Sequence, residues 1–162
     1  MSVETVKQYF KQFGIDGRVR ELEDSSATVE LAALALGVQG ARIAKTLSFK
    51  VGDRCVLIVA AGDAKIDNAR YKAYFGTKAK MLTAQEVPEL TGHPVGGVCP
   101  FAVPKEVKVY LDESLKRFDT VFPACGSANS AIELTCGELM QYAKAAGWID
   151  VCKNWQAEGE VK

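Results

Sequence analysis

The sequence lacks the residues that build disulfide frameworks, zinc sites and most histidine-based catalytic centres. Its five cysteines form an odd, scattered set without a CxxC pair: Cys55, Cys99, Cys125, Cys136 and Cys152. Such a set argues against both disulfides and a zinc site. His93 is the single histidine, so any Ser-His or Cys-His scheme would depend on it. Nothing in the sequence places His93 beside a nucleophile.

Long apolar runs and an excess of charge of one sign are also missing. No apolar run approaches the ~18 residues of a membrane span, and the N-terminal stretch MSVETVKQYF lacks a signal-peptide pattern. We therefore expect a cytoplasmic protein that does not contact a membrane. Twenty Lys and Arg side chains balance twenty Asp and Glu side chains, whereas a protein that grips long nucleic acid should be more basic.

One local excess of positive charge is present. Residues 61–80 contain five basic side chains against two acidic ones: Lys65, Arg70, Lys72, Lys78 and Lys80 against Asp63 and Asp67. This cluster predicts either a few phosphate contacts or an ordinary solvated helix face.

The 162 residues fit a single domain with an ordinary core. Periodicity and caps predict helices over 3–13, 28–36, 67–76, 113–118 and 135–147, and strands over 43–51, 55–61, 107–111, 120–125, 130–134 and 148–152. Thr83 and Thr135 each begin a T-x-x-E capping box. Hairpins that alternate with helices indicate an α/β domain built on a mixed sheet.

Lys45 is the first irregular feature. The segment IAKTLSFKV, residues 43–51, alternates between apolar and polar positions, which predicts one face in the core and one in water. Lys45 has the parity of the apolar residues, and an unpaired buried charge costs several kcal/mol. Its amine either reaches water at the strand edge or lies at the floor of a cavity that receives an anionic ligand.

The second irregular feature is the loop TGHPVGGVCPFAVP, residues 91–104. The adjacent Gly96 and Gly97 permit positive φ angles and let backbone N–H groups come close to a ligand. Three prolines stiffen the loop. Such N–H groups could hold a carboxylate, a phosphate or a developing oxyanion, but a rigid surface turn explains the same residues.

Four further residues have both a structural and a functional interpretation. Asp112 fits the cap of a short helix. Ser127 and Asn129 fit a tight turn, although both could hydrogen-bond a ligand. Cys99 could be a nucleophile or a redox thiol, but Pro100 follows it, so no helix N-terminus directly activates the thiol.

Several segments together resemble the YbaK/EbsC family, which is related to the editing insertion domain of bacterial prolyl-tRNA synthetases. They are AKTLSF around Lys45, GD at Gly62 and Asp63, TGHPVGGVCPF from Thr91, VYLDESL from Val109, and the glycine turn before AIEL. The likeness extends from the first helix to about residue 146, so residues 1–152 are expected to form the editing domain and 153–162 a C-terminal tail. One departure is Ala102, where many relatives have glycine.

The resemblance implies a compact α/β fold with a mixed, barrel-like sheet and helices outside. It also implies hydrolysis of the ester bond in misacylated tRNA, typically tRNA(Pro) carrying cysteine, alanine or another small amino acid, without a metal or other cofactor. In the family, activity depends on the lysine matching Lys45, and the loop matching Gly96 to Pro100 lines the pocket near the aminoacyl carbonyl. The expected catalytic residues are Lys45, Gly96, Gly97, Val98 and Cys99; the expected substrate-binding residues are Pro100, Phe101, Asp112, Gly126, Ser127 and Asn129.

The expected partner is the acceptor end of misacylated tRNA, and prolyl-tRNA synthetase could hold the rest of the tRNA. A protein that touches only the acceptor end needs few phosphate contacts, which agrees with zero net charge. The alternative is a non-catalytic module that binds an aminoacyl-adenosine, a nucleotide or another anionic group, since no nucleophile or base is obvious. The sequence does not determine the oligomeric state.

Overall fold

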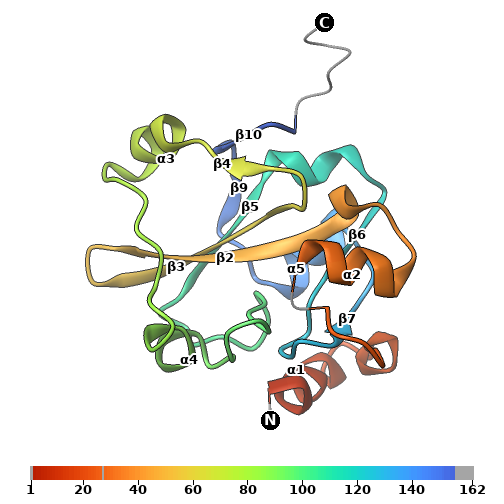
Figure 1. Ribbon diagram of the computed structural model, residues 1–162. Helices are drawn as coiled ribbons and strands as arrows, with labels where there is room; N and C mark the ends of the chain where they lie inside the picture. Colours follow the sequence, from red (N-terminus) through yellow and green to blue (C-terminus); the bar gives the residue numbers. More distant parts are fainter. Residues whose placement is uncertain (1, 27, 156–162) are drawn as a thin grey trace, which may run out of the picture.

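A mixed, curled sheet of six strands forms the centre of the molecule (Figure 1). The computed structural model describes residues 2–26 and 28–155. The strand order is β8-β6-β2-β3-β5-β9, with bounds β2 (Ile43–Val51), β3 (Arg54–Ala61), β5 (Lys108–Asp112), β6 (Thr120–Pro123), β8 (Leu134–Thr135) and β9 (Gly147–Ile149). The β2–β3 and β6–β8 pairs are antiparallel and the other pairs are parallel. The predicted mixed, barrel-like α/β architecture is therefore confirmed.

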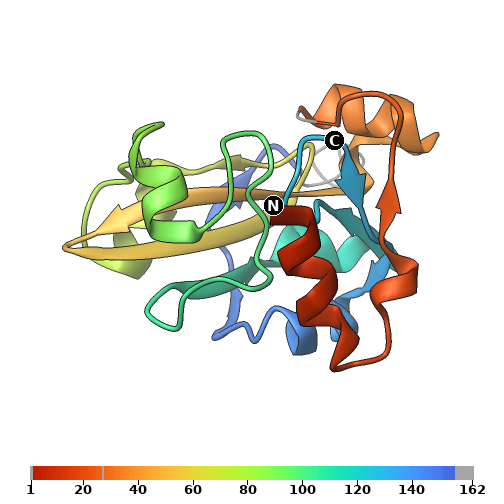
Figure 2. The ribbon, with the colours of Figure 1, turned by 90° about the horizontal axis from the view of Figure 1, so that it is seen from below.

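Two small sheets and several helices surround the central sheet (Figures 1 and 2). The small sheets pair β1 (Arg20–Glu21) with β7 (Ser130–Ala131), and β4 (Lys65–Ile66) with β10 (Cys152–Lys153). The helices are α1 (Ser2–Lys11), α2 (Val29–Leu36), α3 (Asn68–Phe75), α4 (Glu86–Thr91) and α5 (Cys136–Tyr142), with 3-10 turns η1 (Asp16–Arg18), η2 (Gly40–Arg42) and η3 (Glu113–Arg117). None of the described helices is long and apolar enough to cross a membrane.

The local capping signals predicted several helix ends correctly. Thr28 accepts a hydrogen bond from the N–H of Leu31, and α2 ends at Gly37, whose positive φ of 71° suits glycine. Asp67 caps α3 in the same way. The capping box at Thr135 is present with both of its hydrogen bonds. These ends depend on residues three or four apart, which is why the sequence alone indicated them.

Two predicted strands and one predicted helix end were wrong, and two short strands were missed. The expected strand 148–152 is divided between β9 and β10, which belong to different sheets. The expected strand 130–134 is divided between β7 and β8, which pair with different partners. The last helix ends at Tyr142, before the predicted end at Gly147, because Gly147 pairs with Tyr110 at the start of β9. The short strands β1 and β4 carry no periodic signal in their two residues each and were not predicted.

The predicted division of β2 into a core face and a water face was also wrong. Phe49 contacts Tyr71 of α3 on one face, with ring centroids 5.1 Å apart. On the other face Ser48 is buried, and Lys50 pairs with Glu86 of α4 at 2.6 Å. Both faces are covered because α3 and α4 lie on opposite sides of the β2–β3 hairpin (Figure 1).

Asp112 joins three parts of the fold. Its carboxylate is fully buried at the end of β5; Oδ2 accepts the N–H of Ser114 at 2.9 Å and Oδ1 accepts the N–H of Val151 at 3.0 Å. The side chain therefore holds η3 and the segment before β10 against β5. This is the helix-cap role that the sequence indicated, extended by a second, long-range contact.

We expect Asp112→Ala to lower the free energy of unfolding by roughly 2–4 kcal/mol, because two buried N–H groups lose their acceptor. Chemical denaturation measures this change. The exposed neighbour Asp119 provides the control, and Asp119→Ala should stay within about 0.5 kcal/mol of the wild type. Equal effects of the two substitutions would contradict the role assigned to Asp112.

Candidate functional site

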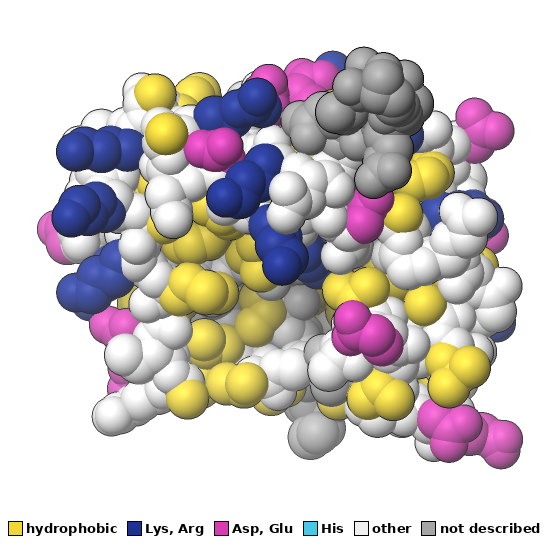
Figure 3. All heavy atoms as spheres, turned by 45° about the horizontal axis from the view of Figure 1, so that its top comes forward, with side chains coloured by type: hydrophobic (Ala, Val, Ile, Leu, Met, Phe, Trp, Pro, Cys, Tyr) yellow, Lys and Arg dark blue, Asp and Glu magenta, His cyan; other side chains and the backbone are white. Residues whose placement is uncertain are grey.

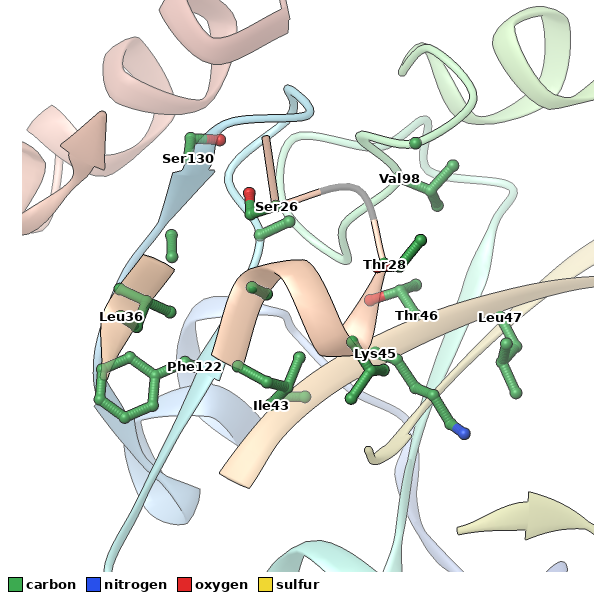
Figure 4. Close-up of a pocket in the computed structure, with 16 residues that line it drawn as sticks. Ser26, Thr28, Leu36, Ile43, Lys45, Thr46, Leu47, Val98, Phe122 and Ser130 are labelled. Carbon is green, nitrogen blue, oxygen red and sulfur yellow. The ribbon is translucent and has the colours of Figure 1, made fainter. Parts of the chain in front are cut away.

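A pocket opens where two strands of the central sheet separate. β6 pairs with β2 only at Ile43 and Ala44, and the next backbone partner on that edge is Met81, which bridges to Phe49. Residues 45–47 of β2 therefore have no strand beside them there. α2 and the glycine loop occupy the space and leave a pocket of about 290 Å³ (Figure 4). Its lining comprises Ser26, Thr28, Val29, Ala32, Leu36, Ile43, Ala44, Lys45, Thr46, Leu47, Gly96, Val98, Phe122, Ala124, Ser130 and Ala131.

Lys45 lines this pocket with a half-buried side chain. Its Nζ donates hydrogen bonds to the backbone oxygens of Gly62, at 3.3 Å, and Ala64. Burial lowers the pKa of Lys45, while the nearby Asp63 acts in the opposite direction. In Figure 4 the amine points away from Thr46 and Val98. The predicted cavity lysine and glycine loop thus border one pocket, but the amine is bound by carbonyls of the β3–β4 turn.

The two glycines of the loop have different roles. Gly96 has a positive φ of 89° and lines the pocket. Gly97 does not have the positive φ that the sequence suggested, and its N–H donates to Pro94 O at 2.9 Å. A Cβ on Gly97 would lie 2.8 Å from the backbone N and Cα of Ser127. Gly97 therefore allows the loop to pack directly on the backbone of the neighbouring turn.

Of the residues predicted to be catalytic, Lys45, Gly96 and Val98 line the pocket, whereas Gly97 and Cys99 do not. Cys99 is fully buried, and burial raises the pKa of its thiol to about 12. Its Sγ lies 3.5 Å from Nε2 of His93, and that nitrogen lies 2.8 Å from the oxygen of Phe101. Burial lowers the pKa of His93. A neutral, enclosed thiol of this kind is a packing residue and a poor nucleophile.

None of the predicted substrate-binding residues lines the pocket. Phe101 is fully buried, and its ring centroid lies 4.8 Å from that of Phe10 in the core. Ser127 donates to Ser130 at 2.8 Å, and Asn129 donates to Leu22 O at 3.0 Å. The remaining three are buried: Pro100 in the loop itself, Asp112 at the end of β5, and Gly126 in the turn before β7. Of these residues, Ser127 contacts the pocket lining directly, through Ser130.

Sequence reasoning missed the polar residues that face the pocket from α2, β2 and β7. Ser130 borders it instead of its neighbours Ser127 and Asn129. Thr28 and Thr46 both line the pocket (Figure 4), and the buried Oγ1 of Thr46 has no hydrogen-bond partner among the described residues. The position next to Lys45 could have indicated Thr46. Nothing local could have indicated Phe122, because β6 reaches β2 only in the folded chain.

Ala102 has a φ of 56°, in the left-handed region that favours glycine. The resemblance noted in the sequence places glycine at this position in many relatives. The loop therefore keeps the backbone conformation that suits glycine, although this chain has alanine there.

The comparison with protein-family models matches residues 23–142 to the aminoacyl-tRNA editing domain. This match covers most of the chain, and the chain belongs to that family. The resemblance to the YbaK/EbsC family that the sequence indicated is thereby confirmed.

Three individual proteins are informative. YwhH of Bacillus subtilis (strain 168), an uncharacterized protein, is 57% identical over 96% of this chain and 100% of its own length. EbsC of Enterococcus faecalis, provisionally named a Cys-tRNA(Pro)/Cys-tRNA(Cys) deacylase, is 30% identical over 66% of each chain. A crystal structure provisionally described as a trans-editing enzyme for prolyl-tRNA synthetase has a TM-score of 0.84 at 29% identity, over 94% of this chain and 97% of that chain.

We expect Gly97→Ala to lower the free energy of unfolding by about 1–3 kcal/mol, because the new Cβ must push apart two backbone segments. Gly137 is a matched control, since a Cβ there has nothing nearer than 3.9 Å. Gly137→Ala lies within α5 and should stabilise the protein by about 0.5–1 kcal/mol. Denaturant titration of both variants measures the change in the free energy of unfolding. A Gly97→Ala variant as stable as the wild type would rule out the close packing of loop and turn.

Proposed function

We propose that the protein is a trans-editing deacylase. It would hydrolyse the ester bond of misacylated tRNA, with tRNA(Pro) carrying cysteine, alanine or a similarly small amino acid as the substrate. The observation that carries this proposal is that Lys45, Gly96 and Val98 line one small pocket in a chain of the editing-domain family. The names of EbsC and of the similar crystal structure support the reaction and the link to prolyl-tRNA synthetase.

An editing enzyme exists because a synthetase rejects a slightly smaller amino acid poorly. A missing methylene changes binding by only about 1–3 kcal/mol, so errors are removed by later hydrolysis. A pocket of about 290 Å³ would restrict the size of the amino acid that enters. Apolar side chains from α2, β2 and β6, such as Leu36, Ile43 and Phe122, form much of its wall and suit a small aliphatic group or a thiol.

The proposed mechanism relies on charge and positioning. The Lys45 ammonium would anchor the phosphate of the terminal adenosine or polarise the ester. None of the described residues accepts a hydrogen bond from the N–H of Gly96 or Val98, so these groups could steady the carbonyl oxygen as negative charge develops on it. Water, or the side chain of the substrate, would attack the carbonyl carbon. The carbon–oxygen bond to the ribose then breaks and the tRNA hydroxyl is restored. Attack by water releases the free amino acid, whereas attack by the thiol of a cysteine substrate releases a thiolactone that water must then open.

The remainder of the tRNA acceptor end would meet exposed lysines. Lys65, Lys72, Lys78 and Lys80 are exposed, and none of them forms an ion pair with another described residue. Lys72 and Lys78 border a surface cavity of about 490 Å³ beside α3. Figure 3 shows a hollow with hydrophobic side chains whose margin carries Lys and Arg side chains. A few such contacts suffice for a protein of zero net charge.

The proposal includes residues 1–152 as the editing domain, residues 153–162 as its tail, and the cytoplasm as the location, where aminoacyl-tRNA is used. Prolyl-tRNA synthetase would be the partner that holds the body of the tRNA. The alternative, a non-catalytic binding module, differs from a deacylase in its expected behaviour. It predicts saturable binding of the ligand without multiple-turnover release of free amino acid.

Lys45→Ala should reduce hydrolysis of the preferred misacylated tRNA by about 10²-fold or more. Lys45 is the only cationic side chain among the described residues that line the pocket, and the substitution removes it. A panel of tRNA(Pro) charged with cysteine, alanine, serine and proline measures release of the free amino acid. Lys105→Ala, an exposed lysine outside this pocket, is the control. Full activity of Lys45→Ala excludes the mechanism, and no turnover of any substrate by the wild type excludes the enzyme.

The double variant Lys72→Ala, Lys78→Ala should raise KM for charged tRNA by about 3–10-fold with little change in kcat, because phosphate contacts are lost away from the ester. The dependence of KM on salt concentration should become shallower. Lys105→Ala, Lys108→Ala removes the same charge from a different surface and serves as the control. Identical behaviour of the two double variants would disprove the assigned tRNA surface.

A further inference from the structure

The position of the Lys45 amine is set by one short turn. Its two acceptors, the oxygens of Gly62 and Ala64, flank Asp63 in the turn between β3 and β4. The N–H of Ala64 donates to Ala61 O at 3.0 Å, which closes the turn, and Ala64 is fully buried. An ammonium group donates three hydrogen bonds, so two acceptors in this turn determine its direction and leave one donor for a ligand.

The backbone of this turn is held on one side by η2. A Cβ on Gly62 would lie 2.0 Å from Gly40 O, so only glycine permits the observed contact. The N–H of Gly62 also lies 3.4 Å from Ala41 O. The turn thus cannot move toward η2.

On its other side the turn is held by η3. Arg117 donates two hydrogen bonds to the Asp63 carboxylate, Nη1 to Oδ2 at 3.0 Å and Nη2 to Oδ1 at 2.5 Å. The N–H of Ala61 donates to Oγ of Ser114 at 3.1 Å. A two-pronged contact between Arg and a carboxylate fixes both distance and orientation.

Arg117 is itself fixed by further contacts. Its Nε donates to Ser114 O at 3.0 Å, and Nη1 also donates to Trp155 O at 3.0 Å. The guanidinium carbon lies 4.8 Å from the ring centroid of Phe118 and 5.3 Å from that of Trp155. The guanidinium is therefore a rigid support for Asp63, with less freedom than an ordinary surface ion pair has.

We propose that the Asp63–Arg117 pair positions Lys45. Arg117 holds the Asp63 carboxylate and thereby the Gly62 and Ala64 carbonyls that direct the amine, and the negative charge of Asp63 acts on the amine. Both are positioning residues, since neither lines the pocket. The inference rests on the proposed function in so far as Lys45 acts on a substrate.

The charges around the amine affect the pKa of Lys45, so this arrangement can be tested by titration. The titratable groups whose charge acts on Lys45 are Asp63 of the turn, Lys65 of β4, Glu30 of α2 and the thiol of Cys152 in β10. Burial raises the pKa of Cys152, so its thiol is neutral. Burial lowers the pKa of Lys45, and the Asp63 carboxylate partly opposes this effect.

Two substitutions should therefore shift Lys45 in opposite directions. Asp63→Asn removes the negative charge and leaves Arg117, so the pKa of Lys45 should fall. Arg117→Gln leaves Asp63 without its counter-charge, so the pKa of Lys45 should rise. Arg117→Lys keeps the charge but loses the two-pronged contact, so the pKa should stay near that of the wild type. A support that acted through folding alone would not produce opposite shifts.

The test titrates the Lys45 amine directly. In protein labelled with ¹³C at lysine Cε, the Lys45 signal, assigned from its loss in Lys45→Arg, is followed against pH without substrate. The midpoint should move to lower pH in Asp63→Asn and to higher pH in Arg117→Gln. Arg18→Gln is the control, because Arg18 makes an equivalent two-pronged contact with Glu138, at 3.0 and 3.2 Å, away from this turn; its midpoint should not move.

Kinetics provide the second arm. On the preferred misacylated tRNA, kcat should fall about tenfold in Asp63→Asn and Arg117→Gln, a barrier increase that displaced positioning readily produces. Arg117→Lys should recover part of the loss, and Arg18→Gln should match the wild type. Thermal unfolding confirms that each variant is folded at the assay temperature.

The outcomes separate this inference from the proposed function. Opposite NMR shifts in a protein that hydrolyses no aminoacyl-tRNA would uphold the positioning pair and reject the deacylase. Normal hydrolysis with an unmoved Lys45 midpoint in both variants would overturn the positioning pair and uphold the deacylase. Shifts in the same direction in both variants would also overturn it.

Discussion

The site depends on a half-buried ammonium group that is bound by backbone carbonyls. The amine of Lys45 has two carbonyl acceptors, on Gly62 and Ala64, and no direct carboxylate partner among the described residues. Carbonyl dipoles satisfy its N–H groups and reduce the cost of burial without cancelling its charge. The pocket wall therefore keeps a net positive charge that an anionic ligand can neutralise. A lysine already paired with a carboxylate would offer such a ligand no net charge.

The pocket itself follows from sheet topology. β3 pairs with β2 from Ala44 to Val51, but β6 pairs with it only at its first two residues. Between Ala44 and the Phe49–Met81 bridge, this edge of β2 has no strand partner, and α2 and the glycine loop border the pocket there (Figure 4). Because β3 and the helices hold β2 rigidly, the amine of Lys45 and the backbone of Gly96 have fixed places on the pocket wall.

How far the sequence revealed this site can be judged from particular residues. Lys45 stood out because it is a charged residue at a position that the alternating strand pattern assigns to the apolar face. Gly96 stood out because it is one of two adjacent glycines in a loop stiffened by prolines. The same reasoning placed Gly97 and Cys99 in the catalytic group, yet Gly97 serves a backbone contact with Ser127 and Cys99 is enclosed beside His93. Adjacent residues in a loop point in different directions, and a sequence pattern does not specify which of them reach a cavity.

By itself the sequence determined the local structure: the caps at Thr28, Asp67 and Thr135, the β2–β3 hairpin and the family resemblance. These features depend on neighbours within a few residues, whose interactions are the same wherever the segment lies in the fold. Only the tertiary structure decided that the Lys45 amine meets the β3–β4 turn, and that Arg117 of η3 supports this turn through Asp63. Those contacts join residues far apart in the chain, and their geometry arises from packing of the whole domain.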